Sequence, residues 1–153
     1  MTEAARPLVI GIGNVLRGDD GAGYRVAEAL SNGINHCLEV ITVHQLTPEL
    51  VLYISSASHV LFVDASVEQM WVVLKPIAAQ NATTSSAAVG VGHTITPNVL
   101  MAVAQVLYHH CPPAWELLIP AQHWGHGAQL SGLTAEACGQ ALLMAKAWGH
   151  DHA

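Results

Sequence analysis

The sequence predicts an α/β fold, a three-layer α/β/α sandwich built on a mostly parallel sheet of about five strands. Short apolar runs rich in β-branched residues alternate along the chain with longer segments whose apolar residues recur at helical spacing. Such alternation is typical of parallel sheets that carry helices on both faces. The chain has 153 residues, 52% hydrophobic and 10% charged, which suits one domain over residues 1–153 with a substantial core.

The N-terminal segment predicts a strand, a glycine-rich turn and a helix. The strand begins at Leu8, and the helix is expected over about residues 21–31. Asp19 and Asp20 lie side by side in the turn. In an α/β sheet this turn lies at the carboxyl end of a strand, where ligands bind. Two carboxylates would repel a phosphate, so they suit a cation, a positively charged group or acid–base chemistry, unless one of them simply caps the helix.

The later elements follow from the same patterns. Strands are expected over residues 38–44, 59–66, 71–77 and 115–121, and helices over about 47–57, 97–109 and 135–148. Thr47, Thr96 and Thr134 are the expected helix caps. Pro76 places the strand 71–77 at a sheet edge, and its short connection to the preceding strand allows an antiparallel orientation. The tail after Trp148 is expected to fray.

Two further residues are candidates for a functional site. Asp64 ends the apolar run 60–63 at the carboxyl end of a predicted strand, although an Asp there can also cap a turn. If its strand lies parallel and next to the first one, Asp64 and Asp20 emerge at the same sheet edge. His93 lies in a loop just before the helix 97–109, where a solvent-facing role is the alternative. Two carboxylates and one imidazole suit a divalent transition metal with open coordination positions.

Composition excludes several classes of protein. The formal charge is −6 and there are only five Lys and Arg residues, a poor match to nucleic-acid binding. No apolar run reaches the roughly 18 residues of a membrane helix, and the first residues lack a signal-peptide pattern, so a cytoplasmic location is expected. Cys37, Cys111 and Cys138 are far apart and odd in number, which predicts three buried thiols rather than disulfides or a metal pair.

Residues 11–23, Gly-Ile-Gly-Asn-Val-Leu-Arg-Gly-Asp-Asp-Gly-Ala-Gly, resemble the opening signature of the nickel-iron hydrogenase maturation endopeptidases. The blocks 45–50 and 119–121 also resemble that family, the former its branch serving cytoplasmic NAD(P)-linked hydrogenases. The resemblance implies an endopeptidase that removes the C-terminal extension of the hydrogenase large-subunit precursor after nickel insertion. It implies that Asp20, Asp64 and His93 are catalytic and probe the nickel, which the substrate supplies. Asp20 stands where other members carry Glu.

The implied partner is the large-subunit precursor, with no nucleic acid and no membrane, and the chain is expected to act as a monomer. The sequence leaves the mechanism open: a metal could polarise the scissile carbonyl or activate water, or a carboxylate could act as general base. No nucleophile elbow or zinc-protease helix motif is present. The alternatives are a non-catalytic nickel-binding chaperone, a peptidyl-tRNA hydrolase-like esterase, which should carry a basic face, and a nucleotide-binding domain, which the acidic turn disfavours.

Five further residues have secondary interpretations. His123 and His126 are spaced so that they could share a metal, although two of ten histidines can be adjacent by chance. Trp124 between them is expected to help hold a substrate tail. The side-chain amide of Asn14 is expected to orient the turn or Asp20, and Asp19 is expected to be a cap or a spectator.

Overall fold

The computed structural model describes residues 4–33, 37–78 and 95–153, and its centre is a five-stranded sheet in the order β2-β1-β3-β5-β4. The first four strands in that order run parallel, and β4 runs antiparallel to β5 at the edge. The strands are β1 (Leu8–Ile12), β2 (Glu39–Val43), β3 (Val60–Ser66), β4 (Val73–Pro76) and β5 (Ala114–Pro120). The predicted fold class and the edge position of the Pro76 strand are both confirmed.

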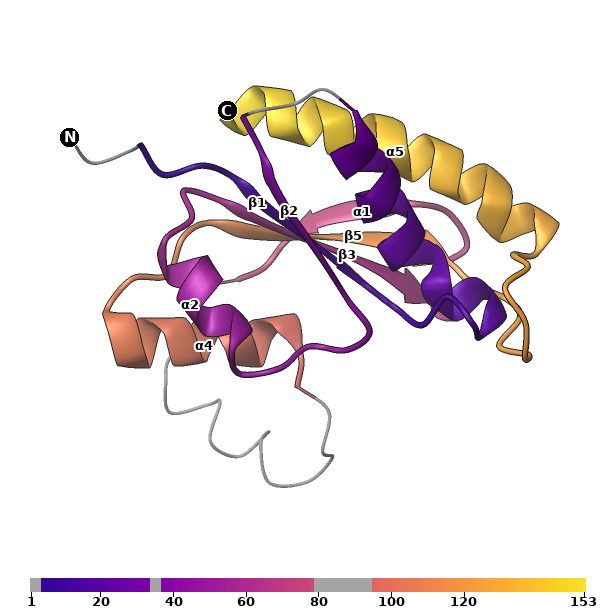
Figure 1. The fold of residues 1–153 in the computed structure, drawn as a ribbon, viewed down its shortest axis with the longest axis horizontal. Coiled ribbons are helices and arrows are strands. Elements are labelled where there is room, and N and C mark those ends of the chain that lie inside the picture. Colours follow the sequence, from indigo (N-terminus) through magenta and orange to yellow (C-terminus); the bar gives the residue numbers. More distant parts are fainter. Residues whose placement is uncertain (1–3, 34–36, 79–94) are drawn as a thin grey trace.

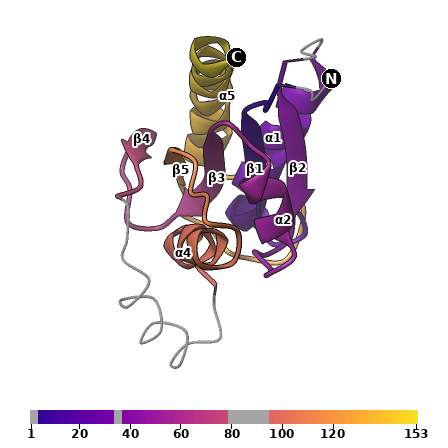
Figure 2. The same ribbon diagram turned by 90° about the vertical axis from the view of Figure 1, so that its left-hand side faces the viewer.

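Helices cover both faces of the sheet (Figures 1 and 2). They are α1 (Ala22–Asn32), α2 (Leu50–Ser55), α4 (Pro97–Tyr108) and α5 (Gly132–His152), with a short 3₁₀ turn, η1 (Gly18–Gly21), before α1. Successive strand residues point to opposite faces. On β3, Leu61 and Val63 therefore pack with α1 and α5, whereas Val60 and Phe62 pack with α2 and α4. Within the described ranges, no helix is both long and apolar enough to cross a bilayer.

The centre of the sheet is a topological switch point. β1 lies between β2 and β3, so the chain leaves its carboxyl end toward one side and later returns on the other. Ligands of open α/β sheets bind at such a point. Here α1 lies against the main chain of the sheet, because a Cβ on Gly23 would overlap the carbonyl oxygen of Val63 and lie 2.6 Å from that of Ile12.

The C-terminal helix differs from its prediction at both ends. Ser131, not Thr134, is the N-cap, and its Oγ accepts from the Thr134 backbone N–H at 3.3 Å. Thr134 is instead fully buried and donates from Oγ1 to the Pro120 carbonyl oxygen at 2.8 Å. The helix continues to His152, whose ring lies 4.7 Å from that of Trp115 between ring centroids. The expected fraying is therefore wrong, because the last turn packs on aromatic side chains.

Two smaller expectations are also corrected. Thr96 caps α4 as predicted, but α2 begins only at Leu50, after Glu49, with no side-chain hydrogen bond at its cap, so Thr47 is not a cap. Cys37 and Cys111 are exposed rather than buried, because they lie just outside the packed elements, and Cys138 is half-buried.

Replacing Gly23 with Ala tests the contact between α1 and the sheet. We expect Gly23→Ala to lower the free energy of unfolding by about 2–3 kcal/mol, because the added methyl must displace two strand carbonyls. Gly139→Ala in α5 is the matched control: a Cβ there meets nothing within 4 Å, and Ala favours helix by about 1 kcal/mol. Urea titration measures both. Equal effects from the two substitutions would contradict the close packing.

Candidate functional site

Asp20 lies in η1, within the turn that leads from the carboxyl end of β1 to α1, and is partly exposed. Its Oδ2 accepts a hydrogen bond from the Asn14 backbone N–H at 3.1 Å. The side-chain oxygen of Asn14 accepts instead from the Leu16 N–H at 3.0 Å and shapes the turn. The amide of Asn14 thus orients the turn, one of its two predicted roles, whereas Asp20 is held by the Asn14 backbone N–H.

Asp64 lies on β3, on the sheet face that packs with α2 and α4, since Phe62 two residues earlier faces that side. Its Oδ1 accepts from the Ala65 backbone N–H at 2.8 Å. This bond does not cap a turn, because β3 continues to Ser66.

The environment of Asp64 strongly disfavours its charge. Burial raises the pKa of the Asp64 carboxyl to about 7; the hydrogen bond from Ala65 opposes this rise, and the carboxylates of Asp20 and Glu116 reinforce it. β1 and β3 pair in parallel with Gly11 opposite Val63, and Asp20 is held by the N–H of Asn14, two residues beyond the end of β1, so both carboxyls lie at the carboxyl edge of these strands. The prediction that Asp20 and Asp64 emerge at the same sheet edge is confirmed.

Asp19 has a role that its sequence position did not indicate. It is completely buried, and its carboxylate accepts from the backbone N–H of Gln122, His123 and Ser131 and from the Ser131 hydroxyl, at 2.7–2.9 Å. Burial alone would raise the pKa of Asp19, but these hydrogen bonds hold it at about 2. The expectation of a cap or spectator is wrong: the N-cap of α1 is Gly21, and Asp19 fastens the acidic turn to the loop before α5.

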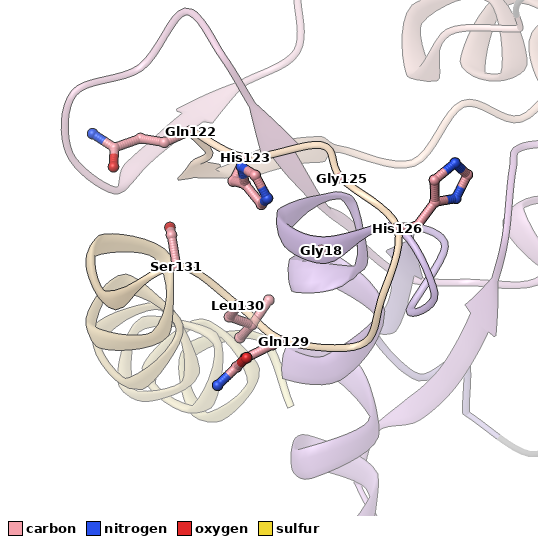
Figure 3. A pocket seen from close by; sticks show the side chains of 8 residues that line it. All are labelled: Gly18, Gln122, His123, Gly125, His126, Gln129, Leu130 and Ser131. Atoms are coloured by element: carbon pink, nitrogen blue, oxygen red, sulfur yellow. The ribbon is translucent and has the colours of Figure 1, made fainter.

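A cavity of about 540 Å³ opens between this loop and the acidic turn (Figure 3). Its lining residues are mostly polar: Gly18, Gln122, His123, Gly125, His126, Gln129, Leu130 and Ser131. The backbone of Gly18, with φ of 58°, comes so near that a Cβ would lie 2.8 Å from the His123 carbonyl oxygen. The wall of the cavity is therefore built from main chain on both sides.

The two histidines of this loop do not form a ligand pair. Their exposed rings lie on separate parts of the loop, with Gly125 between them (Figure 3). The ring of His123 folds back over Gly125, where a Cβ would lie 2.7 Å from its Nε2. Shared metal binding by His123 and His126 thus has no support from their geometry.

His93 lies outside the described residues, four positions before the first residue of α4. In the part of the chain that is described, no group of three or more His, Cys, Asp or Glu side chains is arranged to hold a metal. Asp20 and Asp64 nevertheless suit a cation that arrives with a ligand, because a positive charge between them would relieve their repulsion. Their grouping with His93 stays a prediction.

The fold is that of the hydrogenase maturation endopeptidases. The chain is similar to the hydrogenase maturating endopeptidase HybD from E. coli, with a TM-score of 0.72, 20% identity and coverage of 95% of this chain and 93% of that one. It is also similar to the [NiFe] hydrogenase maturation protease HycI from Thermococcus kodakarensis KOD1, with a TM-score of 0.70, 22% identity and coverage of 93% and 91%. No protein-family model and no curated protein matches the sequence.

Asp19→Asn tests the buried fastening. An amide offers one acceptor oxygen where the carboxylate offers two, so buried donors of Gln122 or Ser131 lose their partner. We expect a loss of about 2–4 kcal/mol in unfolding free energy at pH 7. Because the pKa of Asp19 is lowered on folding, its stabilisation should be complete above about pH 4 and decline as the pH falls toward 2. The matched control, Asp20→Asn, should cost less than about 1 kcal/mol, and a comparable loss in both variants would refute the difference in roles.

Asp64→Asn tests whether ionisation of the Asp64 carboxyl lowers the stability of the metal-free protein. Because the pKa of Asp64 is raised on folding, between about pH 4 and pH 7 the folded protein keeps the proton on this carboxyl, whereas the unfolded chain has lost it. The free energy of unfolding therefore falls as the pH rises through this range. The neutral amide removes that penalty. We expect Asp64→Asn to match the wild type at pH 4 and to exceed its unfolding free energy by about 3 kcal/mol at pH 8. Urea titrations at both pH values measure this, and a difference independent of pH would contradict it.

Proposed function

We propose that this chain is an endopeptidase that removes the C-terminal extension of a nickel-iron hydrogenase large-subunit precursor after nickel insertion. The observation that carries the proposal is the pair of carboxyls, Asp20 and Asp64, at the switch point of a fold shared with hydrogenase maturation endopeptidases. The opening motif at residues 11–23 supports the same function, since it supplies both the close helix contact and the acidic turn.

In this proposal Asp20, Asp64 and His93 contact the nickel that the precursor already holds. Bringing a divalent cation next to Asp64 lowers its raised pKa, so the carboxyl releases its proton to solvent and becomes a ligand. A precursor without nickel offers no charge to offset the repulsion between the two carboxylates. Selectivity for the loaded substrate then follows from the difference in binding energy between the two substrate states.

Peptide hydrolysis has two routes within this proposal. The substrate's nickel can polarise the scissile carbonyl or the attacking water. Alternatively, a carboxylate takes the proton of water as general base, a role for which a pKa near neutrality is suited. In both routes Asn14 is a positioning residue, because its N–H fixes the Asp20 carboxylate at the edge of the sheet. A cytoplasmic location, action as a monomer and service to an NAD(P)-linked hydrogenase are further parts of the proposal.

The test is a mass-spectrometric assay of the large-subunit precursor, nickel-loaded and nickel-free, with and without this protein. We expect a C-terminal peptide to be lost from the loaded precursor only. Asp20→Asn should lower the rate by about 100-fold or more, since a ligand to the recognised cation is gone, and His93→Ala should weaken engagement of the loaded precursor. Glu28→Gln, an exposed change on α1, serves as the matched control and should cleave normally.

Cleavage of both precursor forms at equal rates would refute nickel sensing while leaving the protease. Full activity of Asp20→Asn would remove that residue from the site, and unchanged engagement by His93→Ala would remove His93. No cleavage of either form, together with tight nickel binding by the isolated protein, would replace the proposal with the non-catalytic nickel-binding chaperone.

A further inference from the structure

Large apolar side chains are exposed on the three loops that follow β1, β3 and β5. We call them the apolar rim, and their exposed fractions are high: Leu16 66%, Val67 62%, Met70 78%, Trp71 67% and Trp124 37%. Solvated methionine and tryptophan side chains are unusual on a monomer surface, and both residue types are enriched in protein–protein interfaces. Their gathering on loops of one edge is therefore informative in a way that a single exposed leucine is not.

Backbone hydrogen bonds hold the rim loops together. The Ala121 N–H donates to the Ser66 carbonyl oxygen at 3.0 Å, which joins the loop after β5 to the end of β3 just before Val67. The Gly127 N–H donates to the Leu16 carbonyl oxygen at 2.9 Å, and the Asp19 N–H donates to that of His123 at 2.9 Å. The loops after β1 and β5 are therefore joined to each other and to the end of β3, from which the third loop leaves, at the end of the sheet opposite the two chain termini (Figure 1).

The rim and the two carboxyls share this edge. Val67 follows Asp64 by three residues, and Leu16 precedes Asp20 by four. A site for a free small molecule would enclose its ligand in a concave, largely apolar pocket. Here the cavity at the edge is mostly polar, and none of the five rim residues lines it, although their side chains are exposed. Exposed apolar side chains of this kind suit a protein partner that contacts them with a broad surface of its own.

We propose that the apolar rim is the docking surface for the folded body of the protein substrate, and that Met70 and Trp71 are its main anchors. This inference rests on the proposed function, and it adds which residues recognise the partner. The rim residues are uncharged, so the matching patch on the substrate should be apolar as well. Docking on the rim holds the substrate body over the edge, while its metal-bearing segment reaches Asp20 and Asp64.

The test compares two variants of the full chain with the wild type. Met70→Ser/Trp71→Ser removes the anchors, and Leu143→Ser removes an equally exposed side chain, 68%, from α5. With the nickel-loaded precursor we expect the double variant to raise KM at least 10-fold with kcat unchanged, as truncated interface anchors do. Leu143→Ser should leave both values as in the wild type. Urea titration should give all three proteins the same unfolding free energy within about 0.5 kcal/mol, which excludes misfolding as the cause.

A separate binding measurement distinguishes this inference from the proposed function. Isothermal titration of the nickel-loaded precursor into Asp20→Asn protein, with and without the rim substitutions, reports docking without cleavage. A Kd weakened at least 10-fold by the rim substitutions supports the inference even if the wild type cuts nothing. Unchanged KM and Kd overturn the inference but leave the proposed protease function intact.

Two other occupants of the apolar rim would also overturn the inference. One is a second copy of this chain, shown by a wild-type dimer in sedimentation that Met70→Ser/Trp71→Ser converts to monomer. The other is a lipid surface, shown by wild-type binding to phosphatidylglycerol vesicles that the double variant loses.

Discussion

The geometry of the candidate site depends on the buried carboxylate of Asp19. A buried charge is costly unless hydrogen bonds and favourable partners offset its loss of hydration. Here three backbone amides and one hydroxyl converge on it, and its pKa falls to about 2 despite complete burial. The same bonds fasten the turn after β1 to the loop that leads from β5 to α5. Asp20, the polar cavity and part of the apolar rim all lie on these two segments, so their relative positions follow from that one group.

Asp19 and Asp64 carry the same side chain, but their surroundings give them different roles. Asp19 meets many donors and is held ionised, which makes it a structural group. Asp64 is partly buried with one hydrogen-bond donor and two nearby carboxyls, and its pKa is raised to about 7. The hydrogen bonds to Asp19 stabilise the fold, whereas burial and the nearby carboxyls make ionisation of Asp64 unfavourable. Carboxyls whose pKa is raised in this way are found more often at functional sites than at structural ones.

Local pattern predicted the strands, their order along the chain and the shared edge of Asp20 and Asp64, because these follow from side-chain period and from the parallel topology. It failed where distant residues decide the outcome. The donors to Asp19 lie 103 to 112 positions away, so nothing beside it in the sequence indicated its role. The last turn of α5 is ordered by Trp115 on β5, which no helix-end signal could reveal. His93 and its place near the carboxyls stay a prediction, since it lies outside the described residues.

The contact of α1 with the sheet has an evolutionary consequence. Gly23 brings the main chain of α1 against the carbonyl oxygens of Val63 and Ile12, and Gly11 leaves room on β1 for the small Ala27 and the Gly23 carbonyl of the helix. The spacing between α1 and β3 is then set by backbone contact and by the small Ala27, and it depends little on which larger apolar residues fill the layers on either side. Substitutions can accumulate throughout the interior without moving the two carboxyls apart. A lineage of such proteins can therefore diverge until little of its interior sequence is shared, provided that these few glycines persist.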